Sequence, residues 1–470
     1  MIRQTFSSPQ RRPPQWLRHA GDVTDARWYV SGIALVLAGI LLHQPLLLIL
    51  GILVLLVLCI TDLWARYCLL HLTYSRQISE QRVIFGEEIT LSLTIENSKI
   101  LPLPWLEIEE TVPRLLPIED QELRNATQNN AAILECLFSP NWYERVTRRY
   151  TVQCMTRGVH TFGPTTLRSG DVFGFISRET SLDSYQFVLV YPLVVPLTSF
   201  GLPARHPFGD RRAPRRLLED PSRVIGIRDY QYGDSLRRVH WKATARTTQL
   251  QSKVYEATTT YTLAIFLNLE FRPDTHYGVH PELQELSITA AASVTDWAIE
   301  NNYAVGLYAN TMMFIPDDHL SFAHIQQGTQ DIHEAVAEQL RKRRIRLPIS
   351  SNIDQRQRIM EALARVQGYF GSNIEELLQS ERHRLPAGTT IALITSTLSE
   401  QLADQLVHLR QSGHSVAILF VGDNPAPFRL AGIPIYHLGG ETAWKELVAA
   451  HSQGTEATQH EIEATRSFQL

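Results

Sequence analysis

The stretch DYQYGDSLRRVHWKATAR, residues 229–246, holds the side chains of this chain whose types and spacing most readily suggest chemistry. Ser235 follows a glycine and an aspartate, so a nucleophilic serine is the first function to consider. Such a serine needs a general base within hydrogen-bond reach and donors for the oxyanion that forms during acyl transfer. Whether the chain supplies that base decides whether this stretch is a catalytic motif.

The letters GDSL also occur in a group of lipases and esterases. Those enzymes place the serine near the chain start, after a buried first strand, and usually take the base from an Asp-x-x-His. None of the 17 histidines here has an aspartate three residues before it, and IGIRDYQY, which precedes Gly233, is not a clean buried strand. A GDSL-like hydrolase is therefore a remote alternative, which loss of esterase activity in Ser235→Ala would support.

The other side chains of this stretch are of types that brace or bind proteins. Arg237 and Arg246 each carry five donors, which can fork onto Asp234 or onto backbone carbonyls. Trp241 offers a large apolar surface with one N–H donor. The stretch is thus either a brace that holds an α/β domain against a β domain of the same chain or an exposed docking surface. The residues concerned are Tyr230, Gly233, Asp234, Arg237, Arg238, Trp241 and Arg246.

Charge and cysteine usage exclude other functions. The 44 basic and 48 acidic residues leave a net charge of −4, which gives no electrostatic case for nucleic acid as a partner. No Cys-x-x-Cys pair is present, so no zinc site is predicted. The four cysteines are interpreted as buried apolar residues, and a Cys136–Cys154 disulfide would require an oxidising compartment. No cofactor is predicted.

A membrane anchor is predicted near the N-terminus. Residues 29–60 contain no Asp, Glu, Lys or Arg, and one helix spans a bilayer with about 20 apolar residues. His43-Gln44-Pro45 interrupts the run, so we expect two tight spans, about 27–43 and 45–66, joined by a very short turn. A cleaved signal peptide is the competing interpretation, but its apolar core would be only about 7–15 residues long.

Arginines on both flanks of this hairpin predict its orientation. Arg18 and Arg27 are among those before it, and Arg66 and Arg76 are among those after it. The positive-inside rule then places both termini and the large body in the cytoplasm, in a multi-pass protein of the cytoplasmic membrane. A single span would instead put the body outside.

The rest of the chain divides into two regions with different patterns of apolar residues. In residues 72–200, apolar residues alternate, as in EEITLSLTIENS, which indicates half-buried strands and a β-sandwich-like domain. From about residue 255, continuous apolar runs such as Ile391–Ile394 alternate with helical stripes, one of them preceded by a capping-box candidate, Thr397-x-x-Glu400. This alternation is typical of a doubly wound, Rossmann-type α/β domain.

These patterns together predict a multi-domain α+β protein. The expected parts are a cytoplasmic arm at 1–26, a two-helix transmembrane hairpin at 27–68, the β-sandwich-like domain at 72–200, a linker and signature segment at 201–254, the α/β domain at 255–450 and a flexible tail at 451–470.

A longer pattern within 230–246, Y-x-x-G-D-x-x-R-x-V-x-W-x-x-x-A-R, resembles the bacterial domain of unknown function 58 (DUF 58) family. The stretch RGVHTFGPTTLRSGDVFGF, residues 157–175, is similar to another segment of that family, and the N-terminal hairpin agrees as well. The resemblance covers roughly residues 30–450. It implies a von Willebrand factor A-like fold for the α/β part, association with MoxR-type AAA+ ATPases and no established reaction.

The same resemblance raises the question of a metal. Von Willebrand A-type domains often hold Mg²⁺ at a D-x-S-x-S loop after the first strand, and hard oxygen ligands suit that ion. The corresponding residues here are Asn268, Glu270 and Arg272, of which only Asn268 and Glu270 could coordinate a cation. A divalent-cation-dependent ligand-binding domain is therefore the alternative function.

The function expected first is a membrane-anchored, non-enzymatic scaffold or adaptor. Its expected partners are the lipid bilayer, a MoxR-type AAA+ ATPase and further membrane proteins of the same system, which would together serve assembly or maturation of protein complexes or of the cell envelope. One basic run, Arg341–Arg344 with Arg346, is expected to be a solvated helix end, with attraction to anionic lipid as the alternative.

Overall fold

The computed structural model describes residues 26–126, 130–171, 176–203, 207–208, 218–232, 234–258, 261–270, 280–312, 344–366 and 373–452. Over these residues the chain is a mixed α+β protein with two compact units, Met1–Val190 and Tyr191–Leu470. Residues 1–25 of the predicted arm and 453–470 of the predicted tail lie outside the described part. The first unit ends at Val190, so residues 191–200, which the sequence assigned to the β region, belong to the second.

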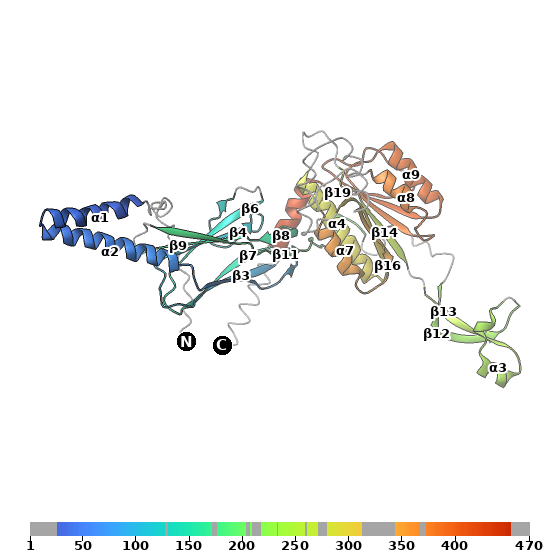
Figure 1. The fold of residues 1–470 in the computed structure, drawn as a ribbon. Helices are drawn as coiled ribbons and strands as arrows, with labels where there is room; N and C mark the ends of the chain where they lie inside the picture. The colour runs from blue at the N-terminus through green and yellow to red at the C-terminus, as the bar shows by residue number, and fades with distance from the viewer. Residues whose placement is uncertain are drawn as a thin grey trace, which may run out of the picture. The chain divides into compact units, whose positions relative to one another are not determined.

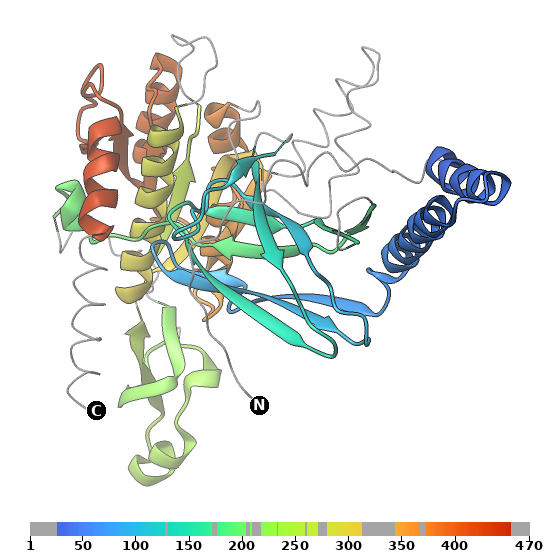
Figure 2. The same ribbon diagram turned by 90° about the vertical axis from the view of Figure 1, so that its left-hand side faces the viewer.

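Two antiparallel helices open the first unit, α1 (Ala26–Leu41) and α2 (Pro45–Tyr67), and they lie side by side in Figure 1 and in Figure 2. Pro45 occupies the first turn of α2, where an amide N–H would have no helical acceptor. A Cβ on Gly39 would lie 2.6 Å from a backbone nitrogen of α2, and a Cβ on Gly51 would lie 2.7 Å from one of α1. The two backbones therefore pack as closely as small residues allow in membrane helix pairs.

One helix of the described residues, α2, is long and apolar enough to cross a membrane. Its 23 residues extend about 34 Å at the rise of an α-helix, which exceeds a hydrocarbon core of about 30 Å. The 16 residues of α1 extend only about 24 Å. The structure thus contains one apolar helix of the length that a membrane span requires.

The rest of the first unit consists of three sheets. Their orders are β1-β3-β7, β10-β9-β4-β6-β5 and β2-β11-β8. The strands are β1 (Leu72–Ile78), β2 (Arg82–Val83), β3 (Glu88–Asn97), β4 (Leu106–Pro113), β5 (Arg124–Asn125), β6 (Ala131–Phe138), β7 (Arg145–Gln153), β8 (Gly158–Phe162), β9 (Thr165–Gly170), β10 (Ser177–Leu182) and β11 (Gln186–Val190).

The alternating apolar residues that predicted these strands also form their common hydrophobic core. Along β3, Ile89, Leu91, Leu93 and Ile95 are buried while the residues between them are more exposed. They pack in one cluster with buried residues of the larger sheet, including Ile108 and others from β4 and β6. Each sheet therefore turns one face to the core and the other outward.

A buried ion pair joins the three sheets. The guanidinium of Arg76 on β1 pairs with Glu110 on β4, and their side chains are 2% and 0% exposed. Arg76 Nη2 also donates to the carbonyl of Ser184 at 2.8 Å, beside β11. Glu110 Oε2 accepts further hydrogen bonds from Tyr74 Oη at 2.6 Å and from Thr165 Oγ1 at 2.5 Å. The pair is therefore hydrogen-bonded on both sides, which a buried pair needs if it is not to destabilise the fold.

The stretch at 157–171, which carried part of the resemblance, forms β8, β9 and the turn between them. Gly163 in that turn has φ +104°, and a Cβ there would lie 2.1 Å from the carbonyl oxygen of Ser184. Asp171 is buried and accepts the Ile176 N–H at 2.7 Å. These residues thus brace the sheets, while Val172–Phe175 of the same stretch lie outside the described residues.

The second unit is built on a six-stranded sheet of order β16-β15-β14-β17-β18-β19. All neighbours pair in parallel except β15 and β16, which are antiparallel. Numbered along the chain, this is the order 3-2-1-4-5-6 of doubly wound sheets. The strands are β14 (Thr262–Leu267), β15 (Ala304–Met312), β16 (Arg344–Ser350), β17 (Thr390–Thr395), β18 (Ser415–Val421) and β19 (Ile435–Gly439).

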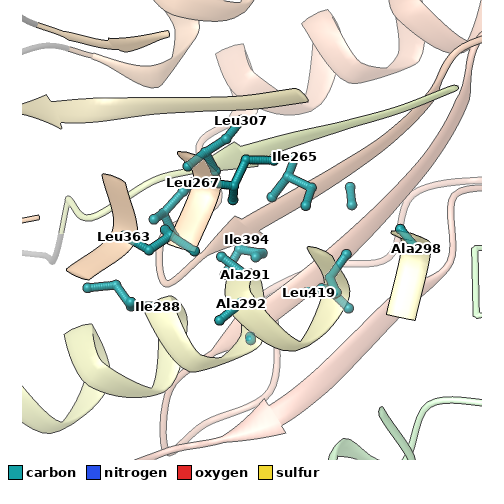
Figure 3. Close-up of a cluster of buried hydrophobic side chains, with 14 of the residues drawn as sticks. Ile265, Leu267, Ile288, Ala291, Ala292, Ala298, Leu307, Leu363, Ile394 and Leu419 are labelled. Carbon is teal, nitrogen blue, oxygen red and sulfur yellow. The ribbon is translucent and has the colours of Figure 1, made fainter. Parts of the chain in front are cut away.

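Helices cover both faces of this sheet. Ile265 and Leu267 of β14 face α4 (Pro281–Glu300) and α7 (Gln355–Ala364), in the cluster that Figure 3 shows. The alternate residue Phe266 faces α8 (Ile374–Glu381) and α9 (Glu400–Gln411). Burial on both faces explains why these strands are continuous apolar runs in the sequence.

The predicted cap of α9 is wrong by two residues. Ser399, not Thr397, is the N-cap, and its Oγ accepts the N–H of Leu402 at 3.0 Å. The amide and hydroxyl of Thr397 are instead used by residues at the ends of β14 and β17, as described below. Sequence spacing alone could not reveal that competing use.

The central role of the buried ion pair is testable. We expect Arg76→Met to destabilise the first unit by about 3 to 5 kcal/mol, because Glu110 would keep its charge without a partner. Calorimetric unfolding of the full-length chain in detergent would show the loss. The control is Arg145→Met, which breaks an exposed pair with Glu96 and should cost less than about 1 kcal/mol. Equal effects of the two substitutions would contradict this role.

Candidate functional site

The signature residues lie at the end of an antiparallel hairpin. Strands β12 (Leu218–Asp229) and β13 (Gln251–Thr258) pair from Leu218↔Thr258 to Asp229↔Gln251. Between them the chain forms a short 3₁₀ turn, η3 (Leu236–Arg238), and the helix α3 (Trp241–Thr247), which Figure 1 and Figure 2 show at the far end of the hairpin. We call residues 230–250 the tip segment. The region that the sequence described as linker and signature thus contains a hairpin.

Asp234 organises the tip segment. Its carboxylate accepts the N–H of Gln231 at 3.1 Å and the Nη2 of Arg228 at 2.7 Å. Its backbone carbonyl accepts the hydroxyl of Tyr230 at 2.9 Å. The Gln231 N–H, followed by the Arg228 guanidinium, holds the pKa of Asp234 below its usual value. The carboxylate therefore fixes the turn in its ionised form, while Gly233 itself lies outside the described residues.

The expected partners of Asp234 are different in the structure. Asp234 forms an ion pair with Arg228, six residues earlier on β12, and not with Arg237 or Arg246 as the sequence suggested. Both of those arginines are exposed, and neither has an ion-pair partner within the described part of the chain. Arg238 is partly buried and lies close enough to lower the pKa of Asp234 further. Two cationic side chains of the signature are thus left facing water.

Large apolar side chains of the tip segment are exposed as well. Trp241 is 67% exposed, and Leu236 is similarly accessible. Tyr232, which the sequence did not single out, is fully exposed. Val239 is buried by comparison and holds η3 to β13 through a bridge with Ser252. Tyr230, Asp234 and Val239 therefore hold the tip segment itself together, whereas Trp241 lies on its surface.

Ser235 has no activating partner among the described residues. It precedes η3, where its side chain makes no capping hydrogen bond. His240, the histidine of the stretch, uses Nδ1 to accept the N–H of Ala243 at 3.0 Å at the start of α3. A general base would have to reach Ser235 Oγ for nucleophilic catalysis, and the tip geometry supplies none.

The second candidate site lies where β14, β15 and β17 end. Asn268, directly after β14, is fully buried, and its Nδ2 donates to Thr395 Oγ1 at 3.0 Å and to Thr397 Oγ1 at 3.4 Å. Its Oδ1 accepts Asn310 Nδ2 at 2.6 Å and the backbone N–H of Glu270 at 3.1 Å. We call these residues the strand-end network. The sequence missed Asn310 and Thr395, because only the pairing of β15 and β17 with β14 brings them together.

This network leaves little for a cation to bind. Both lone pairs of the Asn268 oxygen are occupied by N–H donors, and a hard cation requires several free oxygens. Among the described residues, no three His, Cys, Asp or Glu side chains cluster as a metal site would require. Glu270 retains a free carboxylate, but burial and the nearby Glu375 raise its pKa. The residues present do not fit the Mg²⁺ ion of a D-x-S-x-S loop, and Arg272 lies outside the described residues.

The basic run near residue 344 also differs from its prediction. Arg344 and Arg346 lie on strand β16, not at a helix end, and they pair with Glu376 and Glu381 of α8. Residues 341–343 of the run lie outside the described residues. The described arginines therefore hold a helix to the sheet edge.

One protein family matches the chain. The family described as "Protein of unknown function DUF58" matches residues 226–417. That range begins within β12 and runs through the tip segment to β18, so it contains both candidate sites.

A curated relative also matches about half of the chain. The chain is 25% identical over 247 residues to "Uncharacterized protein YeaD" of Bacillus subtilis (strain 168), which covers 52% of this chain and 57% of the relative. The match thus spans little more than half of the relative's length.

Solved structures match only about a quarter of the chain, at low similarity. The sporulation control protein Spo0M of Bacillus subtilis is 13% identical, with a TM-score of 0.16, over 26% of this chain and 49% of that one. A cohesin module from Clostridium perfringens is 11% identical, with a TM-score of 0.18, over 26% of this chain and 95% of the module. Similarities this low carry no argument about function.

The strand-end network can be tested without a metal. Asn268→Ala should destabilise the second unit by about 1 to 3 kcal/mol, because it removes the buried amide whose hydrogen bonds join Asn310 of β15 to Thr395 of β17. The measurement is thermal unfolding of the full-length chain, with exposed Asn352→Ala as the control. Millimolar Mg²⁺ should not shift the wild-type transition. A Mg²⁺-dependent shift that disappears in Asn268→Ala would contradict the geometry.

Glu270 gives a pH-dependent prediction. Its pKa is raised in the folded protein, so folding favours the protonated form and stability falls as pH rises through that raised value. Glu270→Gln should therefore raise the unfolding temperature at pH 7, and the gain should vanish below the unfolded-state pKa of about 4.3. Exposed Glu446→Gln is the control. An equal gain at both pH values would show that neither the burial of the Glu270 carboxylate nor its repulsion by Glu375 is the cause.

Proposed function

We propose that this chain is a membrane-anchored, non-enzymatic adaptor that binds a protein partner through the tip segment. The partner we propose is a MoxR-type AAA+ ATPase that acts in assembly or maturation of protein complexes or of the cell envelope. The observation that carries the proposal is the combination of exposed Trp241 with exposed Arg237 and Arg246, which have no ion-pair partner among the described residues. Tryptophan and arginine are the side chains that most often dominate protein interfaces.

The anchor in this proposal is the α1–α2 hairpin. The length and apolarity of α2 support one span, and the close contacts at Gly39 and Gly51 support a second helix packed beside it. The flanking arginines favour a cytoplasmic position for both termini. An ATPase in the cytoplasm could then reach the tip segment.

We further propose that the second unit is the von Willebrand A-like module that the resemblance implies. Its doubly wound strand order supports this, as does the position of Asn268 directly after the first strand of the sheet. In this chain, hydrogen bonds within the strand-end network replace the cation of that module. Partner binding would then proceed without a metal ion and would rely on the tip segment instead.

Charge defines the surface that the tip segment would bind. Arg237, Lys242 and Arg246 are exposed, whereas the Asp234 carboxylate is paired with Arg228 and Asp229 accepts a hydrogen bond from Gln251. The cations therefore exceed the anions that remain available. The complementary partner surface is acidic, with an apolar pocket for Trp241.

The docking proposal predicts a loss of binding without unfolding. Trp241→Ala and Arg237→Glu should each weaken partner binding by about 2 kcal/mol or more, which is roughly a 30-fold loss. The measurement is gentle detergent extraction of native membranes with an ATP analogue, capture on a C-terminal tag and quantification of the ATPase by mass spectrometry.

Matched controls come from the first unit. Trp142 is 65% exposed, and Arg149 is also exposed, so Trp142→Ala and Arg149→Glu should leave capture unchanged. If Trp241→Ala and Arg237→Glu lower the unfolding temperature and all four variants capture the ATPase equally, the tip segment is a brace and the proposal fails.

A further inference from the structure

A groove of about 300 Å³ lies at the carboxyl end of α2. Four of its lining residues occupy one face of the helix, since they are spaced three, one and three positions apart. The other lining residues include two from the connection between β3 and β4. The helix residues are Ile60, Leu63, Trp64 and Tyr67, and the connection supplies Lys99 and Leu101. We call this feature the α2 groove.

The walls of the α2 groove continue the apolar surface of the helix. Ile60 is 49% exposed and Leu63 is 56% exposed. Ile60 is the last residue of the uncharged run 29–60, and Leu63 lies three residues beyond it, still within the apolar helix α2. Trp64 and Tyr67 are aromatic residues just beyond that run, where membrane helices meet the headgroup layer. With α2 in a bilayer, the groove would open onto lipid at the depth of the headgroups.

Lys99 gives this apolar groove a single cation. Its Nζ donates to the carbonyl of Leu70 at 2.7 Å and to the carbonyl of Cys68, which are left without helical partners where α2 ends. An ammonium group has three N–H donors, so one remains for another acceptor. No other Lys or Arg lines the groove among the described residues.

The electrostatic state of Lys99 favours an anion beside it. Burial of the ammonium group lowers its pKa, and a nearby negative charge would offset that effect. An apolar wall with one partly desolvated cation at its end matches an amphiphile that has a hydrocarbon chain and an anionic head. Free phosphate would use the cation but would leave the apolar wall exposed.

We propose that the α2 groove binds an anionic phospholipid of the membrane in which α2 is anchored, with an acyl chain along Leu63 and the phosphate on Lys99 Nζ. This inference rests on the proposed membrane anchor. It goes beyond the anchor because it predicts selectivity for anionic lipids. An apolar groove without Lys99 would accept the acyl chain of any lipid. The bound headgroup would also tie the cap of α2 to the surface of the bilayer.

The test uses the full-length chain reconstituted in nanodiscs that contain equal amounts of phosphatidylglycerol and phosphatidylcholine. Native mass spectrometry then measures which lipid remains bound after release. We expect the anionic lipid to be retained about tenfold more than the zwitterionic one, because the choline cation of phosphatidylcholine repels Lys99 and offsets the attraction of the phosphate. Lys99→Met should abolish this preference, and Lys99→Arg should keep it. Leu63→Trp, which fills the groove, should reduce retention of both lipids.

The controls separate the possible failures. Lys445→Met removes an exposed lysine that pairs with Glu441, and it should leave lipid retention unchanged. Equal retention of both lipids by the wild-type chain, or an unchanged preference in Lys99→Met, would overturn the lipid proposal while leaving the anchor intact. Recovery of the untreated chain in the soluble fraction of the cell would overturn the anchor itself, and the lipid proposal with it.

Discussion

Each strong polar group that folding removes from water must find a partner, because an unpaired one costs more than most contacts gain. Both units of this chain depend on how that constraint is met. In the first unit, Arg76 and Glu110 form a buried ion pair. Glu110 also accepts hydrogen bonds from Tyr74 and Thr165, and Arg76 donates one to a backbone carbonyl. In the second unit, the buried side-chain amide of Asn268 forms hydrogen bonds with Thr395 of β17 and Asn310 of β15. In each place, the satisfied group fixes how separate strands lie against one another.

The constraint also separates structural residues from residues available for binding. Arg76, Arg228, Arg344 and Arg346 all have carboxylate partners. The strand-end network lies at the carboxyl edge of a doubly wound sheet, where such folds usually bind ligands, yet its hydrogen bonds are made internally. Exposed cationic and aromatic side chains are found instead on the tip segment, beyond the end of a two-stranded hairpin. The surface proposed to bind a partner is therefore a different element from the sheet edge.

Local patterns predicted much of the fold. The break at His43-Gln44-Pro45 separated two helices, and alternation such as that of Ile89–Ile95 identified strands. The continuous apolar runs indicated strands buried on both faces, as β14, β17 and β18 are. These features depend on residues within a few positions of one another, so a single sequence contains them.

The chemistry of the candidate sites was less accessible to sequence reasoning. Asn268 and Asn310 are 42 residues apart, and they meet only because β14 and β15 pair in parallel. The partner of Asp234 was assigned to arginines inside the signature, whereas the hairpin register brings Arg228 to it from outside. Thr397 matched a capping box, but its hydroxyl accepts a hydrogen bond from Asn268, which follows β14. Pairings of this kind are set by tertiary structure, and residue spacing does not encode them.

The glycine contacts between α1 and α2 bear on how the chain would enter a bilayer. Gly39 and Gly51 bring the two helix backbones so close that neither position can carry a side chain without separating them. A helix as short as α1 would span the hydrocarbon layer poorly alone, while the long neighbour beside it could compensate by thinning or tilt. The two helices would then enter the bilayer together as a packed hairpin, not one after the other. Deletion of α1 would expose the backbone of α2 at Gly51 to lipid, and that backbone is covered in the hairpin by Val36 of α1.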